Sequence, residues 1–217
     1  QAMFPVMVYR LVSSAQTVVL VDGNGRMVVP PVHATDRPPD DAAGDGFAPA
    51  PVPSSMNLGI IGAGSLGSAL GERLGHAGHA IMFGGAASAQ DAAVRQEAAV
   101  GSNADAVAFG DVVVLAVPFA AVDAALADAG PLSGRVLWSC VNAVRSDLTG
   151  LAVGFDNSAA EEVARRAPGA LVVSALPPFA HAIASPPLAY DCDLAPTVFL
   201  CGDEERAKGV VGNLVRD

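Results

Sequence analysis

Residues Leu58 to Gly67 read L-G-I-I-G-A-G-S-L-G, an apolar run followed by three glycines in the spacing G-x-G-x-x-G. In a dinucleotide-binding turn of this kind, the first glycine allows a tight turn out of a strand. The second lets the backbone approach a pyrophosphate, and the third lets the next helix pack closely. Gly62, Gly64 and Gly67 occupy these three places. Phosphates held there would lie at a helix N-terminus, where unpaired N–H groups and the helix dipole favour an anion.

The flanking sequence has the strand, turn, helix, strand order that this motif requires. Residues 57–61 suit a buried strand, and Leu66, Leu70 and Leu74 recur every four residues, which places them on one face of a helix. Residues 79–83 then form a second apolar strand. Because 23 of the 217 residues are glycine, a packing turn without a ligand is the alternative, but this context favours nucleotide binding.

Composition excludes several other classes of function. The net charge is -10 and the 12 Lys and Arg residues are scattered, so no basic cluster is present to bind nucleic acid. The apolar runs fall far short of the ~20 residues of a membrane-spanning helix, and no basic region precedes an apolar core at the N-terminus. We therefore expect a soluble, cytoplasmic protein without nucleic-acid or membrane partners.

Three cysteines, Cys140, Cys192 and Cys201, show no C-x-x-C spacing. Their odd number and spacing predict neither a disulfide framework nor a metal site. We expect buried, reduced thiols. Cys140 is predicted at the end of a strand, where ligands approach in this architecture, so a catalytic thiol there is kept as the minor alternative.

Residues 1–55 form a predicted N-terminal extension. The β-prone stretches 17–21 and 26–29 flank D-G-N-G, which predicts a hairpin. The stretch 30–55 contains seven prolines and four aspartates, a linker composition.

Met56 directly precedes the nucleotide-binding strand. This suggests that the enzymatic unit, the Rossmann domain over residues 56–217, begins there. A natural N-terminus upstream of Met56, found by mass spectrometry, would contradict that start. The chain stops at Asp217 on a predicted helix, where a doubly wound domain would usually add a strand, so we expect an incomplete C-terminus.

Strands and helices are predicted to alternate beyond residue 83. Three of the helices have capping signals: Ser88 opens a helix to about Val100, Ser158 and Glu161 form a capping box for a helix through Arg166, and Asp203 caps the last helix. A further helix is marked by Val122 and Leu126, and the strands are residues 111–117, 135–140, 171–175 and 197–201. The pattern predicts an α/β fold, a Rossmann-type doubly wound and mostly parallel sheet with helices on both faces.

The region that would read the ribose 2′ position is I-M-F-G-G-A, residues 81–86. It holds no carboxylate for a 2′-hydroxyl, which favours NADP over NAD, yet it also lacks the usual Arg for a 2′-phosphate. Gly84, Ser88 and the N–H groups that open the second helix are the remaining candidates, with Arg95 as a further one.

Five segments follow one another in a specific order: G-I-I-G-A-G-S-L-G (59–67), V-V-L-A-V-P-F (113–119), V-G-F-D-N-S-A-A-E-E-V (153–163), A-P-G-A-L-V-V-S-A (167–175) and P-T-V-F-L-C-G-D (196–203). In this order the chain resembles the NADPH-dependent deazaflavin coenzyme (F-420) reductases, or deazaflavin-dependent NADP oxidoreductases, over roughly residues 56–217. The resemblance implies a small Rossmann enzyme that transfers a hydride between NADP(H) and a deazaflavin co-substrate, mainly by holding both aligned. It also implies a homodimer.

The resemblance assigns site residues by segment. The pyrophosphate would be held by Gly62, Ala63, Gly64, Ser65, Leu66 and Gly67, and the ribose side lined by Ala116, Val117 and Pro118. Asn142 and the turn Ser174-Ala175-Leu176 would face the nicotinamide and the second substrate.

Three segments depart from the family pattern. Gly85-Ala86 stands where Ser-Arg is usual, and Val141-Asn142-Ala143 and Ala175-Leu176-Pro177-Pro178 replace T-N-P and A-F-N. The hydride-acceptor site is therefore remodelled. An NADP-dependent reductase of another acceptor (an imine, a ketone or a metal) is the first alternative function, and a non-catalytic nucleotide sensor is the second.

The histidines give one weak catalytic candidate. His181 follows P-P-F-A near the expected acceptor side and could hydrogen-bond a substrate carbonyl. His76 and His79 flank the turn after the first helix, at the opposite end of the sheet, and are expected to be surface residues.

Overall fold

The computed structural model describes residues 20–21, 27–28, 55–85, 87–96, 98–154, 156–175 and 198–217. Near the N-terminus, β1 (Leu20–Val21) and β2 (Met27–Val28) pair antiparallel, with Leu20 opposite Val28. The two strands lie within the stretches predicted to flank the hairpin turn. The predicted turn at 22–25 and nearly all of the Pro-rich linker lie outside the described residues.

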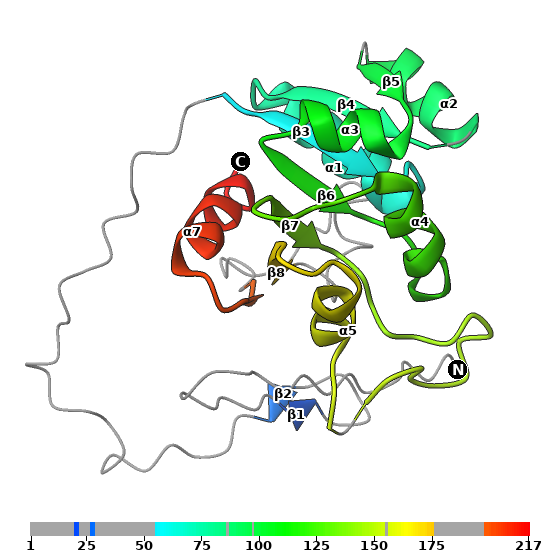
Figure 1. Cartoon of the computed structure of the whole chain (residues 1–217), viewed down its shortest axis with the longest axis vertical. Coiled ribbons are helices and arrows are strands. Elements are labelled where there is room, and N and C mark those ends of the chain that lie inside the picture. The colour runs from blue at the N-terminus through cyan, green and yellow to red at the C-terminus, as the bar shows by residue number, and fades with distance from the viewer. Residues whose placement is uncertain are drawn as a thin grey trace, which may run out of the picture.

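Seven strands form one sheet in the order β5-β4-β3-β6-β7-β8-β9 (Figure 1). All neighbours are parallel except β8 and β9. The strands are β3 (Asn57–Ile61), β4 (Ala80–Gly84), β5 (Ala99–Gly101), β6 (Val112–Leu115), β7 (Val136–Ser139), β8 (Leu171–Ala175) and β9 (Leu200–Cys201). The chain builds outward from β3 to β5 and then returns to β6 on the other side of β3. The sheet therefore has its topological switch point between β3 and β6, where doubly wound proteins bind ligands.

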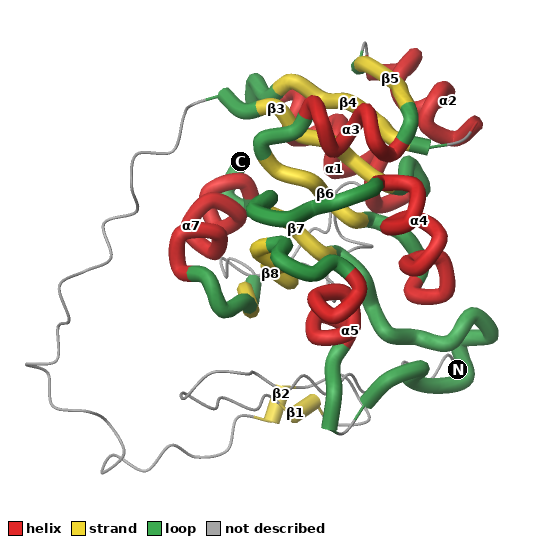
Figure 2. The backbone as a smooth tube through the Cα atoms, viewed as in Figure 1, coloured by secondary structure: helices red, strands yellow, loops and turns green. Residues whose placement is uncertain are grey.

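Helices cover both faces of the sheet (Figure 2). Side chains of α1, α2 and α7 pack in one apolar cluster, and side chains of α3, α4 and α5 pack in another. The helices are α1 (Ser65–His76), α2 (Ala87–Gln96), α3 (Asn103–Phe109), α4 (Val122–Ala129), α5 (Ala159–Arg166) and α7 (Glu205–Leu214), with a 3₁₀ turn η2 (Phe119–Ala121) before α4. The predicted doubly wound α/β fold is confirmed.

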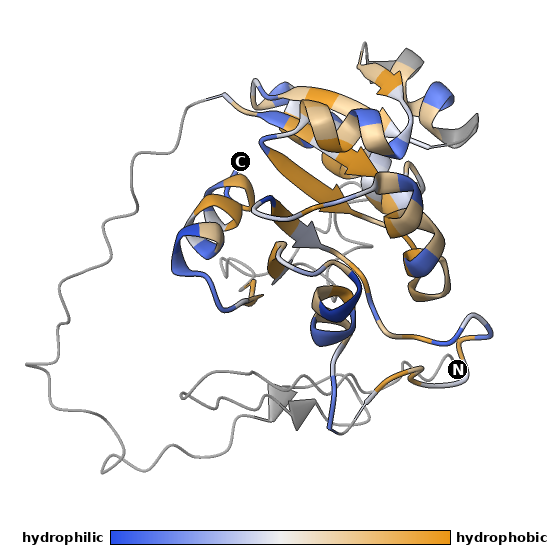
Figure 3. Cartoon of the chain, viewed as in Figure 1, coloured by the Kyte–Doolittle hydropathy of each residue, from blue (hydrophilic) through white to orange (hydrophobic). Residues whose placement is uncertain are grey.

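Strand β6 shows why a strand at the centre of the sheet needs a continuous apolar run. Val112 and Val114 point to the cluster with α1, Val113 and Leu115 to the cluster with α4, and all four are fully buried. Figure 3 shows this strand apolar along its length. A strand that is buried on both faces is apolar at every position. A half-exposed antiparallel strand instead alternates apolar and polar residues.

The predicted helix from Ser88 to about Val100 is wrong at both ends. Helix α2 already begins at Ala87, so Ser88 is its second residue rather than its cap. Ala99–Gly101 is not helical but pairs with Met82–Gly84 as the edge strand β5. Alanine and valine at these positions are compatible with a helix or a strand. Pairing with the otherwise unpaired edge of β4 favours the strand.

Helix α3 was missed by the sequence analysis. It begins with a capping box in which the Ser102 hydroxyl accepts from the Asp105 N–H at 3.1 Å and the Asp105 carboxylate accepts from the Ser102 N–H at 2.9 Å. The Ser102 hydroxyl also donates to the Asp105 carboxylate at 2.7 Å, and this bond, followed by the one from the Ser102 N–H, lowers the pKa of Asp105. The S-x-x-D pattern at 102–105 was the available signal.

The two other predicted caps differ from expectation. Ser158 does cap α5 by accepting from the Glu161 N–H at 3.2 Å, but its own N–H donates to Asn157 Oδ1 at 2.9 Å, so Glu161 does not complete a capping box. Helix α7 has Glu204 rather than Asp203 at its N-cap, with no side-chain hydrogen bond. Within the described residues, no helix is long and apolar enough to span a membrane.

Candidate functional site

The carboxyl ends of neighbouring strands meet along one edge of the sheet. The register places Ile61 beside Gly84 on one side and beside Leu115 on the other, and Leu115 beside Ser139. The segments that follow these strands are therefore adjacent at the switch point. The fold brings together the glycine turn, the turn after β6 and the start of the loop after β7, segments far apart in the sequence.

The three glycines of the turn have different surroundings, and each fits one role of the motif. Gly62 has φ +99°, and a β-carbon there would lie 2.5 Å from the Ala116 carbonyl oxygen. A β-carbon on Gly67 would overlap the Gly62 carbonyl oxygen, whereas one on Gly64 would have no protein atom within 4 Å. Gly62 and Gly67 are therefore required by the fold, while Gly64 leaves open the space in which the motif holds a pyrophosphate.

The start of helix α1 faces this open space. Gly64 is its N-cap residue in an extended conformation (φ -71°, ψ -168°), and no side chain caps the helix. Gly64 and Ser65 are exposed. The Ser68 hydroxyl instead donates to the Ala63 carbonyl at 3.0 Å, which holds the turn against the helix. An exposed N-terminus without a side-chain cap fits a bound pyrophosphate.

The turn after β6 packs beside the glycines. The Ala116 N–H donates to the Ile61 carbonyl at 2.8 Å, and the Val117 side chain lies against Gly62. Pro118 is exposed and is the N-cap residue of η2. These contacts place the predicted ribose-side residues next to the predicted pyrophosphate-binding residues.

The end of β4 has a glycine because helix α3 packs closely against it. A β-carbon on Gly84 would lie 2.8 Å from Asn103 Oδ1, and Gly84 is buried. Gly85 is exposed and has φ +110°. Helix α2 begins two residues later and has no acidic residue in its first turn, which includes Ser88. Gly84, Gly85 and the first turn of α2 therefore carry no carboxylate of their own that would repel a 2′-phosphate, and nucleotide contacts by Gly84 and Ser88 stay predictions.

The carboxyl ends of β7 and β8 are more enclosed. Cys140 is buried, and burial raises the pKa of its thiol, which argues against a catalytic thiolate. Asn142 is half-buried in the loop after β7. Ala175 is fully buried, and its carbonyl accepts from the Trp138 indole N–H at 3.4 Å, so its predicted cofactor contact stays a prediction. Leu176, Cys192 and the catalytic candidate His181 lie outside the described residues.

His79 is not the surface residue that the sequence suggested. It is 7% exposed; its Nδ1 accepts from the Met56 N–H at 3.2 Å and its Nε2 lies 3.2 Å from Asp217 Oδ2. The ring therefore joins Met56, just before β3, to Asp217, beyond the end of α7. His76 is exposed, as expected.

A cavity of about 860 Å³ lies near these histidines and is lined by Gly71, Glu72, Gly75, His76, His79, Ala80, Ile81, Ala98, Ala99 and Phe109. Its lining comes from the end of α1 and the amino-terminal side of β4 and β5, so it is not the crevice at the glycine turn. In the part of the chain that the structure describes, no group of three or more His, Cys, Asp or Glu residues is placed to hold a metal ion.

Comparison with known proteins agrees with this geometry. The model of a family described as "NADP oxidoreductase coenzyme F420-dependent" matches residues 57–143, from the start of β3 to the loop after β7. No match was found among curated proteins.

Solved structures share the fold. A protein from Arthrobacter sp. FB24, described as "a putative f420 dependent nadp-reductase", is 24% identical with a TM-score of 0.66, over 74% of this chain and 80% of that one. The hypothetical protein SMa0349 from Sinorhizobium meliloti is 28% identical with a TM-score of 0.60, over 75% and 80% of the two chains. A 1-pyrroline-5-carboxylate reductase from Streptococcus pyogenes is 15% identical with a TM-score of 0.50, over 74% and 55%.

Proposed function

Because residues 57–143 form a domain of the coenzyme F420-dependent NADP oxidoreductase family, we propose that this protein transfers a hydride between NADP(H) and a deazaflavin coenzyme. The observation that carries the proposal is the contrast among the three glycines: two are enclosed by the fold and Gly64 is open. The match covers the segments that build this turn and its neighbours.

The residues at the switch point would act by binding and orienting. The N–H groups of the exposed residues Gly64 and Ser65 would hold the pyrophosphate, and the turn Ala116–Pro118 would line the ribose side. Asn142 would face the nicotinamide, because it follows β7 at the same edge. When bound, NADPH supplies the hydride, and the oxidised deazaflavin takes up that hydride and a solvent proton. Positioning of two competent hydride carriers is the contribution expected of the protein.

The preference for NADP over NAD is part of the proposal. Gly84, Gly85 and the first turn of α2 present no carboxylate, and a carboxylate is what an NAD site uses to bind the ribose 2′-hydroxyl. The N-terminus of α2 would interact favourably with the negative charge of a 2′-phosphate. We also propose a homodimer, in which a second subunit would help to enclose two cofactors.

The test mixes the protein with NADPH and oxidised deazaflavin coenzyme and follows the loss of the deazaflavin's visible absorbance. NADH is the parallel nucleotide, and the Gly64→Ala variant is the control for use of this site. Bleaching with NADPH, slower with NADH and lost in G64A, supports the proposal. Folded protein that binds NADPH but bleaches no deazaflavin contradicts the proposed acceptor, and an imine or ketone panel then identifies another.

A further inference from the structure

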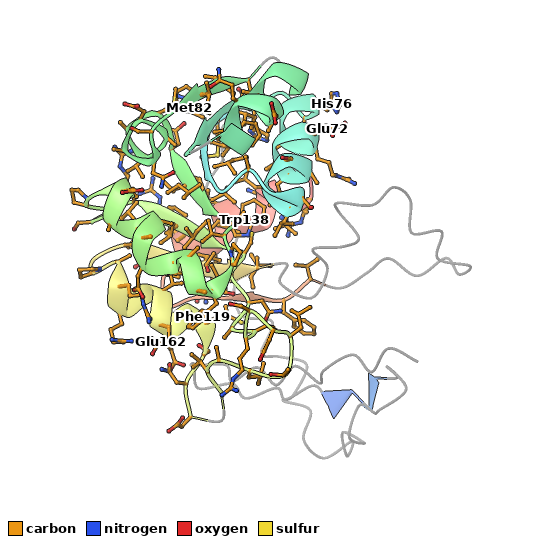
Figure 4. All side chains as sticks on the ribbon, turned by 90° about the vertical axis from the view of Figure 1, so that its right-hand side faces the viewer. Glu72, His76, Met82, Phe119, Trp138 and Glu162 are labelled. Carbon is orange, nitrogen blue, oxygen red and sulfur yellow. The ribbon has the colours of Figure 1, made fainter. Side chains whose placement is uncertain are left out.

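Arg166, the last residue of α5, joins that helix to the turn after β6. Its Nε donates to Asp123 Oδ1 at 2.6 Å, and its guanidinium carbon lies 5.7 Å from the centre of the Phe119 ring. Its Nη1 donates to the Glu162 carbonyl at 3.0 Å and also to the Glu162 carboxylate. Phe119 and Glu162, which Arg166 contacts from two sides, are labelled in Figure 4. One side chain therefore contacts both η2 and the first turn of α4.

Phe119 connects this cluster to the predicted nucleotide site. It directly follows Pro118 and begins η2, whose backbone is closed by the Ala121 N–H donating to the Pro118 carbonyl at 2.9 Å. The Phe119 ring packs against the cluster formed with α4 and α5. A displacement of this ring would therefore be transmitted to the turn Ala116–Pro118, which packs on Gly62 and Gly67.

The partial burial of Arg166 and Glu162 makes the ion pair between them stronger than the ion pair of Arg166 with Asp123, whose side chain is 77% exposed. The side chain of Arg166 is 23% exposed and that of Glu162 is 10% exposed. Charges removed from water interact through a lower effective dielectric constant. The planar guanidinium can also stack on an aromatic ring while donating hydrogen bonds in its own plane, which an ammonium group cannot do.

Arg165 provides a comparison within the same helix. It is also bound to the Glu162 carboxylate, but its side chain is 66% exposed. The described contacts give it no ion pair or ring contact with the turn after β6. The two arginines thus share one carboxylate and differ in the contact across to Phe119 and Asp123.

We propose that Arg166 is a positioning residue that holds the turn Ala116–Phe119 in place for nucleotide binding. This inference rests on the proposed function, because it assigns that turn to the nucleotide site. Arg166 acts through Phe119 and Asp123 and touches no reacting group. Its removal weakens nucleotide affinity without removing a group from the chemistry.

The experiment compares Arg166→Met, Arg166→Lys and Arg165→Met with the wild type. NADPH dissociation constants are measured well below the thermal midpoint of every variant, and the midpoints are recorded. The loss of one partly buried cation–π contact predicts about a fivefold weaker NADPH affinity for R166M. R165M keeps the wild-type affinity. R166K recovers part of the loss, since it keeps the charge but lacks the planar fork.

A second measurement tests whether the effect passes through the ring. In the R166M background, Phe119→Leu should add less to the dissociation constant than it does in the wild type, because the contact is already lost. In turnover, R166M should raise the KM for NADPH and leave kcat near the wild-type value.

The outcomes separate this inference from the function on which it rests. Wild-type protein that binds NADPH, together with R166M that binds it equally well, overturns the inference and leaves the proposed function standing. A lower midpoint with unchanged NADPH affinity shows a merely structural role and also overturns it. Wild-type protein that binds neither NADPH nor NADH overturns the proposed function and, with it, this inference.

Discussion

The carbonyl oxygen of Gly62 occupies the space that a β-carbon on Gly67 would need. The first and third glycines of the motif are thus in direct contact, and helix α1 lies against the turn that precedes it. The same oxygen is held in place by the positive φ of Gly62, a conformation that side chains disfavour. The glycine turn is therefore closely packed at Gly62 and Gly67 but open at Gly64, and a substitution at each of the three positions has its own consequence.

Gly67→Ala should destabilise the protein and weaken nucleotide binding together. The added β-carbon would overlap the Gly62 carbonyl, so the helix or the turn must move. Overpacking of this kind costs about 1–3 kcal/mol. Urea unfolding and NADPH titration measure the two effects, and a variant with unchanged stability would contradict the close packing of α1 on the turn.

Gly64→Ala should leave stability intact and still weaken NADPH binding. Its φ of -71° is accessible to alanine, and no protein atom lies within 4 Å of the added β-carbon. The methyl group would instead project into the space predicted for the pyrophosphate. We expect a thermal midpoint at or slightly above that of the wild type and at least about a tenfold loss of affinity, about 1.4 kcal/mol. Unchanged NADPH affinity would show that the phosphates lie elsewhere.

His79→Ala should destabilise the fold without a direct effect on the nucleotide site. The buried Met56 N–H would lose its acceptor, and the link to Asp217 would be lost. An unpaired buried donor costs about 1–3 kcal/mol. His76→Ala, at an exposed position of α1, is the matched control and should lie within about 0.5 kcal/mol of the wild type. Equal unfolding midpoints for the two variants would contradict the structural role of His79.

Glu162 should make the stability sensitive to acid. Its hydrogen bonds with Arg166 and then Arg165 lower its pKa from 4.5 to about 2. A carboxylate whose pKa is depressed by folding stabilises the protein above its unfolded pKa, and this contribution is lost as the pH falls through the folded pKa. Glu162→Gln should therefore be less stable at neutral pH and should lose less stability between pH 4.5 and 2. Parallel pH dependence of the two proteins would count against the cluster.

Cys140 should resist alkylation in the folded protein. Burial raises the pKa of its thiol, so little thiolate forms at neutral pH, and reagents cannot reach it. Labelling with iodoacetamide followed by peptide mapping should modify Cys140 only after unfolding. Rapid modification of this residue in native protein would revive the alternative of a reactive thiol.

The order of elements around the glycine motif was predictable, because its signals are local and redundant. Residues 57–61 and 171–175 were predicted as strands with the bounds that the structure has. The region from 88 to 109 was not predictable to the same degree. Its alanines are compatible with either helix or strand, and only the open edge of β4 distinguishes β5 from a continuation of α2.

In the candidate site, too, some features follow from local sequence and others depend on contacts between distant residues. The predicted roles of Gly62, Gly64 and Gly67 follow from their spacing, since glycine permits close approach of the backbone and backbone angles that side chains disfavour. The burial of His79 against Met56 and Asp217 could not be read from the chain, because its partners are 23 and 138 residues away. The contact of Arg166 with Phe119 could not be read from the chain for the same reason, because the two residues are far apart in the sequence.

By itself, the sequence determined the doubly wound α/β fold, the glycine turn and the place of the predicted nucleotide site at the end of β3. These depend on hydrophobic periodicity and on backbone angles, which are properties of short segments. Only the tertiary structure decided which histidine is buried and which arginine contacts Phe119, next to the turn after β6. Those outcomes depend on side chains brought together by the pairing of distant strands, and no local pattern records that pairing.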